Sequence, residues 1–143
     1  MFLTVLSTVL SGVFVFILGQ LFIEYVLHPI QKYKALKSKI AYLLVYYGNL
    51  YTNPAGRDKH DERYDEASLE LRKAAAECGA FGEEKPKLTF FVPKKKDFAE
   101  VMGCLIFLSN NMYQQASDIY RQTDEAEKRE SKIKKILRIS ING

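Results

Sequence analysis

The stretch SKIAYLLVYYGNLYTNP, residues 38–54, decides how this chain is organised, because it is either a second membrane span or the core of a small domain. The apolar run between Lys39 and Asn53 is short: as a helix it would reach about 20 Å, against the ~30 Å hydrocarbon core of a bilayer. Apolar residues recur at spacings of three and four from Tyr33 to Leu50. Further apolar residues fill the other faces, so the pattern predicts a buried central helix that is covered by protein on all sides.

The N-terminal segment is the candidate span. Residues 1–23 contain no charged side chain, and a helix of that length covers the hydrocarbon core of a bilayer. A cleaved signal peptide is the alternative, but it normally has a basic start and a shorter apolar run. We therefore expect a transmembrane anchor at residues 1–23, a basic juxtamembrane helix with a hinge at His28-Pro29 over residues 24–39, and a helical domain over residues 40–143.

All 21 lysines and arginines follow this segment. Four of them are expected to contact the membrane surface: Lys32, Lys34, Lys37 and Lys39. The positive-inside rule then places the domain in the cytoplasm and the N-terminus outside. Cys78 and Cys104 lack metal-binding spacing, so we expect free, buried thiols in a reducing compartment.

Helical spacing appears in three further segments, from Tyr64 to Cys78, from Phe98 to Met112, and around Ile133, Ile136 and Leu137. The fold class that follows is mainly α, with one transmembrane helix and a bundle of about four helices. Residues 88–92, LTFFV, are either a short strand or a loop under the bundle.

Glycines punctuate these helices. Gly79 and Gly82 are expected to end the second helix of the domain. Gly103, in the third, is expected to let neighbouring backbones approach closely.

Catalytic signals are missing from the sequence. The two histidines, His28 and His60, stand apart, and neither a nucleophile elbow nor a glycine-rich phosphate loop is recognisable. The acidic residues around HDE, residues 60–62, suit a helix N-terminus for dipole reasons alone. We therefore expect a protein that is not an enzyme, with no metal and no cofactor.

Charge is distributed in blocks, and one basic block falls at a predicted helix start. Lys94, Lys95 and Lys96 occupy the first turn of the Phe98 helix, where cations oppose the helix macrodipole. Such a turn is either a phosphate site, held by lysines and free backbone N–H groups, or a solvated basic turn near an anionic membrane. The second interpretation is preferred. Under the first, the ligand-binding residues are Lys94, Lys95, Lys96, Arg72, Tyr47, Tyr51, Asn110 and Asn111.

Buried tyrosines and asparagines more often satisfy one another than a ligand. Self-association is expected instead from a helical seam that continues out of the span through Phe22, Val26, Tyr33 and Leu36.

The chain resembles a family of small bacterial single-pass inner-membrane proteins without an assigned activity. The resemblance rests on HPIQ from residue 28, IAYLLVYYGNLYTNP from residue 40, EASLELRKAA from residue 66, VPKKKDFAEVMGCLIFLSNN from residue 92 and IKKILRI from residue 133. The family has an acidic residue where this chain has His28 and a serine where it has Lys94. The resemblance implies membrane attachment and a helical domain, and both departures favour an anionic partner.

Two functions follow from this sequence. The leading hypothesis is a non-enzymatic, membrane-anchored interaction or sensing module of the bacterial inner membrane that self-associates. The alternative is a ligand-gated antiviral-defence effector, whose cytoplasmic domain binds a cyclic oligonucleotide and drives membrane disruption. In either case the expected partners are the membrane, further copies of the chain and an anionic ligand (a cyclic oligonucleotide or a lipid headgroup), and no duplex nucleic acid.

Overall fold

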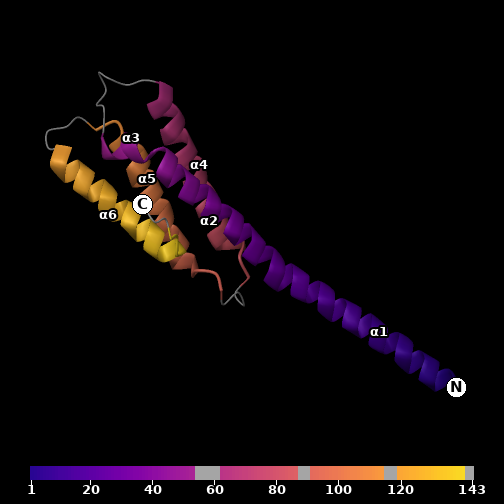
Figure 1. The fold of residues 1–143 in the computed structure, drawn as a ribbon. Coiled ribbons are helices and arrows are strands. Elements are labelled where there is room, and N and C mark those ends of the chain that lie inside the picture. The colour runs from indigo at the N-terminus through magenta and orange to yellow at the C-terminus, as the bar shows by residue number, and fades with distance from the viewer. Residues whose placement is uncertain (54–61, 87–90, 115–118, 141–143) are drawn as a thin grey trace.

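A computed structural model describes residues 1–53, 62–86, 91–114 and 119–140. The elements are α1 (Phe2–Phe22), a π-helical turn η1 (Ile23–Leu27), α2 (His28–Tyr46), α3 (Gly48–Thr52), α4 (Glu62–Glu84), α5 (Lys95–Asn111) and α6 (Ile119–Leu137). Figure 1 shows one long helix that projects from a small helical bundle. The predicted fold class is confirmed, and no strand occurs among the described residues. Of the segment predicted as strand or loop, Phe91 and Val92 lie in a turn, and residues 88–90 lie outside the described part.

The long helix runs without interruption from α1 through η1 into α2 (Figure 1). Its N-terminal part is apolar and has no buried residue, because none of the described residues covers it. By length and composition this is one helix that could cross a membrane.

Pro29 lies inside this continuous helix, where the sequence predicts a hinge. A proline ring clashes with the carbonyl four residues earlier and donates no N–H. The π turn Ile23–Leu27 directly precedes it, and the wider turn gives the ring room. The chain axis therefore continues in one direction from the apolar segment into the domain.

The quoted stretch 38–54 supplies core residues, as predicted. Ile40, Leu43 and Leu44 are at most 3% exposed. The prediction that protein covers this helix on every side is wrong, since Tyr42, at 60% exposed, is joined by exposed neighbours one turn on. The reason is the order of the helices. α5 lies between α4 and α6, and α2 packs along one side of that layer, so that the opposite face of α2 stays uncovered by the described residues.

Tyr33 connects α2 to the other three long helices. Its ring stacks on Phe81 of α4 at 6.5 Å between centroids and meets Phe98 of α5 edge-on at 6.1 Å. Its hydroxyl donates to the carbonyl oxygen of Leu137 at the end of α6, at 2.9 Å. A single side chain thus joins four helices near the point where α1 leaves the bundle.

The two glycines expected to end α4 lie inside it, so that prediction is wrong. A Cβ at Gly79 would come within 3.0 Å of the Met102 sulfur, and one at Gly82 within 3.1 Å of Phe98 Cβ. These positions are small because α4 and α5 approach closely there. Gly103, expected to serve that purpose, faces outward, and a Cβ added to it would meet no described atom within 4 Å.

The remaining predictions for the core hold. Cys78 and Cys104 are free and buried. Ile133 and Leu137 are fully buried on α6.

The last helix, α6, ends at Leu137, and the next residue, Arg138, has a left-handed φ of 55°. The Ile139 N–H then donates to the Lys134 carbonyl oxygen at 2.8 Å, a bond that satisfies the helix end.

The same substitution at two glycines should change stability in opposite directions. Gly103→Ala should raise the free energy of unfolding by about 0.5–1 kcal/mol, because alanine is the better helix former and the site is open. Gly82→Ala should lower it by about 1–3 kcal/mol through overpacking against the buried Phe98 ring. Chemical denaturation of both variants in detergent measures these two changes. A higher free energy of unfolding for Gly82→Ala would show that the α4–α5 contact is looser than described.

Candidate functional site

The basic turn at the start of α5 already has its own anions. Lys94 is the N-cap residue, and its backbone N–H donates to the Asp97 carboxylate at 2.8 Å. Lys95 forms an ion pair with Glu83 at 2.6 Å. Lys94 and Lys96 are exposed and make no ion pair with the described residues. The helix N-terminus is therefore capped internally, and two lysines remain directed to solvent.

The other predicted ligand residues lie at the opposite end of α5. Arg72 of α4 donates to Ser109 Oγ at 3.0 Å and to Asn110 Oδ1 at 2.6 Å. Ser109 also bonds to the Ser68 hydroxyl at 2.7 Å within the interface. From Lys95 to Asn110 the helix rises about 22 Å. One phosphate group cannot contact both ends, so the predicted ligand-binding set does not converge.

Tyr51 and Asn111 of that set serve the core. Both are fully buried, and the Asn111 amide donates to the Tyr51 carbonyl oxygen at 2.8 Å. The Tyr51 hydroxyl lies 2.9 Å from the Leu44 carbonyl oxygen and 2.9 Å from Glu130 Oε2. Burial, followed by the nearby Glu130 charge, raises the pKa of Tyr51 well above its usual range. This neutral phenol joins the end of α2 to α6.

Tyr47 is buried as well, at 6% exposed. Burial, and then the negative charge of Glu66, raises its pKa. The pocket beside it, shared with Tyr46, Asn49 and Arg63, holds about 190 Å³, below the ~300 Å³ at which small-molecule sites begin. The cyclic-oligonucleotide hypothesis, which depends on these residues, therefore gains no supporting geometry and stays a prediction.

Three of the four juxtamembrane lysines are directed onto the domain. Lys32 lies 3.5 Å from Glu84, and Lys39 lies 2.5 Å from Glu77. Lys37 donates to the Arg138 carbonyl oxygen at 2.5 Å, whereas Lys34 is exposed. Lys37 and Lys39 also stand about 20 Å or more along the helix from Ile23, which is well beyond a headgroup layer of ~5–7 Å.

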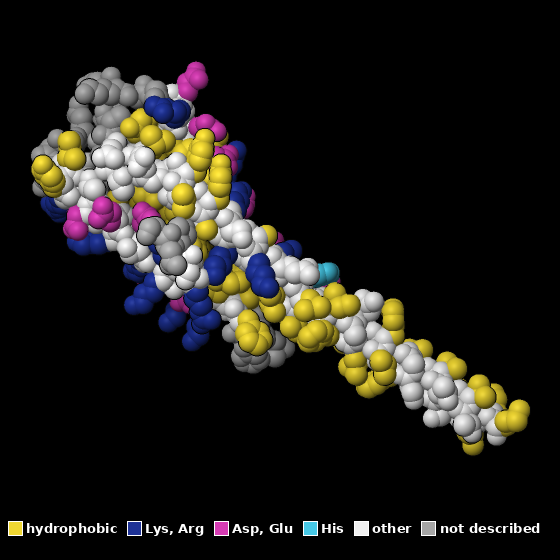
Figure 2. All heavy atoms as spheres, in the orientation of Figure 1, with side chains coloured by type: hydrophobic (Ala, Val, Ile, Leu, Met, Phe, Trp, Pro, Cys, Tyr) yellow, Lys and Arg dark blue, Asp and Glu magenta, His cyan; other side chains and the backbone are white. Residues whose placement is uncertain are grey.

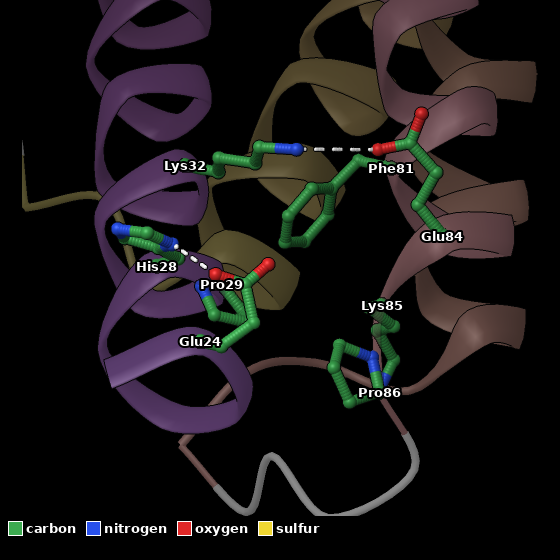
Figure 3. A pocket seen from close by; sticks show the side chains of 8 residues that line it. All are labelled: Glu24, His28, Pro29, Lys32, Phe81, Glu84, Lys85 and Pro86. Carbon is green, nitrogen blue, oxygen red and sulfur yellow. Dashed lines mark hydrogen bonds and ion pairs between the residues drawn. The ribbon is translucent and has the colours of Figure 1, made fainter. Parts of the chain in front are cut away.

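A pocket that the sequence did not indicate lies where the long helix meets α4 (Figure 3). It holds about 170 Å³, and its lining residues are Glu24, His28, Pro29, Lys32, Phe81, Glu84, Lys85 and Pro86. Within it His28 Nδ1 is 3.0 Å from Glu24 Oε2. The pocket is too small for a drug-sized ligand, but it places the end of α4 beside the first charged residue after the span.

The outer face of α2 is the second unpredicted feature. Its exposed residues follow the heptad spacing 4, 3, 4, 3 without a charge: Gln31, Ala35, Ser38, Tyr42 and Val45. The Tyr42 ring stacks on Tyr46 at 5.3 Å, and Tyr46 is 63% exposed. We call the five heptad-spaced residues the α2 stripe.

The predicted self-association seam lies on the other face of the same helix. Its C-terminal half, Tyr33 and Leu36, is buried at 8% exposed each, so it does not form a free surface. The α2 stripe was missed because only two of its five members are large apolar residues, and the stronger apolar pattern of the inner face dominates the sequence.

Comparisons of the chain with known protein families, with curated proteins and with solved structures give no match. The family resemblance thus stays a prediction. No cluster of three metal-ligating side chains occurs in the described part of the chain, and His60 and Asp61 lie outside it.

Removal of one hydroxyl should test the role of Tyr51 in the core. Tyr51→Phe keeps the ring but leaves the Leu44 carbonyl without that donor, so the free energy of unfolding should fall by about 1–3 kcal/mol. The control Tyr46→Phe changes an exposed ring and should stay within about 0.5 kcal/mol. Equal effects of the two changes in denaturant titrations would contradict the assignment of Tyr51 to the α2–α6 junction.

Proposed function

We propose that this chain is a non-enzymatic, membrane-anchored interaction module that self-associates through the α2 stripe. One observation carries the proposal: the helix that is apolar enough to cross a membrane continues directly into α2, whose outer face carries the uncharged α2 stripe, and this stripe is not covered by any described residue. The expected occupant of that face is a second copy of the chain.

Membrane anchoring supports this choice of partner. Two copies anchored by α1 in one bilayer hold their long helices parallel, an arrangement in which a heptad-spaced stripe can pack. The anchor also removes most of the translational and rotational freedom that association would otherwise cost. Ala35 and Ser38 are small enough for close approach, and Tyr42 and Val45 supply apolar area.

The exposed surface of α2 beside the stripe carries a charge. Lys34 is exposed beside the stripe, and lysines that flank a coiled-coil seam disfavour arrangements which bring them together. Leu69 of α4 is 53% exposed and adds to the apolar surface of the domain.

Orientation and location follow from charge. Every lysine and arginine lies on the C-terminal side of the span, so the positive-inside rule favours a cytoplasmic domain. We place the protein in the bacterial inner membrane with its N-terminus outside, on the strength of that rule and of the resemblance described above.

Two exposed serines provide a matched test of the interface. Ser38→Cys, on the α2 stripe, should form a disulfide-linked dimer under mild oxidation of membranes, because equivalent positions of a close parallel pair fall within the ~4.4–6.8 Å Cα separation of a disulfide. Ser131→Cys, at a position on α6 that is also exposed, should stay monomeric. The native thiols are buried and should not contribute.

A charge on the stripe should separate the copies. Val45→Glu in the Ser38→Cys background should abolish the cross-link and leave the unfolding midpoint nearly unchanged, since Val45 is 63% exposed. Cross-linking of Ser131→Cys to the same extent as Ser38→Cys would rule out the α2 stripe as the interface.

A further inference from the structure

The end of the bundle nearest α1 carries a surface that the proposed self-association does not use. We propose that this end docks on an anionic lipid surface, with the Phe91 ring in the headgroup layer and the Lys94 and Lys96 ammonium groups against lipid phosphates. The inference rests on the proposed anchoring of α1, and it adds a second, reversible membrane contact to it.

The height of this end above the membrane follows from the pocket in Figure 3. Glu24 is the first charge after the span, and Lys85 and Pro86 line the same pocket at its level. Glu83, three residues before Pro86, is paired with Lys95 at 2.6 Å. The Lys95 carbonyl oxygen is also 3.8 Å from the position that a Cβ on Gly82 would take. The start of α5 is therefore about one helical turn, ~5 Å, from the level of Pro86, comparable with a headgroup layer of ~5–7 Å.

Phe91 is held outward by its neighbour. Val92 is buried in the core at 6% exposed, whereas Phe91 is 76% exposed. It lies four residues before Lys95, which limits its distance from the start of α5 to ~14 Å. An exposed aromatic ring beside basic side chains is typical of segments that bind at a membrane interface.

Three lysines at this end have no ion-pair partner among the described residues. Lys85, Lys94 and Lys96 make no ion pair with the described residues. Lys94 and Lys96 stand at a helix N-terminus, where the macrodipole disfavours cations and an anionic surface relieves the repulsion. Basic side chains gather along the lower edge of the bundle in Figure 2, toward the end from which α1 leaves.

The position of this surface selects lipid as its partner. An anchored α1 would hold this end of the bundle close to the lipid headgroups, since its lining residues share a pocket with Glu24. The lysines and the ring are therefore near the surface that α1 would bring within reach.

A single tryptophan can report the contact, because the chain has no natural tryptophan. Phe91→Trp in the full chain is reconstituted into vesicles of phosphatidylglycerol and phosphatidylcholine, and separately into phosphatidylcholine alone. Nitroxide groups on the lipid headgroups should quench the introduced indole in the anionic vesicles, and its emission should shift to the blue. The control Tyr46→Trp, on the outer face of α2, should show neither change.

Charge removal tests the lysines. Lys94→Gln with Lys96→Gln, in the Phe91→Trp background, should lower the ratio of docked to undocked protein by about fivefold per lysine. The matched control, Lys73→Gln with Lys128→Gln, removes two paired lysines elsewhere and should leave the ratio unchanged. Added salt should also lower the ratio of docked to undocked protein, because it screens the attraction between the lysines and the lipid phosphates.

The outcomes separate the two proposals. If the Phe91→Trp chain remains in the vesicles after alkaline washing but its indole shows no headgroup quenching, the docking is overturned and the anchoring stands. Shielding of that indole from aqueous quenchers without headgroup quenching would mean a protein contact and also overturns the docking. Chain that washes off the vesicles overturns the anchoring and the docking together.

Discussion

The contacts of Tyr33 hold the domain at a fixed place on the long helix, and the rest of the architecture depends on them. Its ring contacts Phe81 and Phe98, which also contact each other, and its hydroxyl donates to the end of α6. Tyr33 stands about 15 Å along the helix from Ile23. That short distance brings the end of α4 and the start of α5 close to the level of Glu24. If α1 is anchored as proposed, the end of the bundle nearest α1 therefore faces the membrane.

Sequence patterns predicted the elements well, because helices with wide apolar faces need only local spacing to be recognised. The glycines show where such reasoning fails. Gly79 and Gly82 look like helix ends, but they are small because Met102 and Phe98 come within 3.0 and 3.1 Å of their Cβ positions, and this depends on a contact between two helices. The predicted ligand-binding set failed to converge for the same reason, since it also depended on how two helices pack. Lys94 is at the start of α5, whereas the antiparallel course of α4 places Arg72 beside the end of α5.

The long helix has two faces with different roles. Its inner face packs against the bundle, and its outer face carries the α2 stripe. The bundle covers one side of this helix, so the exposed α2 stripe is the face that we propose for another copy. Self-association and docking of the lower end on lipid are compatible, since the stripe runs along the side of the bundle and the lysines lie at its base. Under both proposals, anchoring in the membrane places the α2 stripe beside another copy and the lysines beside lipid.

In the proposed arrangement, one unbroken helix serves as both anchor and core. Spin labels at Ser11→Cys and Ser38→Cys, both exposed positions, measure it directly in bilayers when the labelled chain is diluted with unlabelled protein. An unbroken helix between these positions predicts a narrow distance distribution centred near ~40 Å. A broad distribution at clearly shorter distances would mean that the chain bends at Pro29, and it would contradict the account.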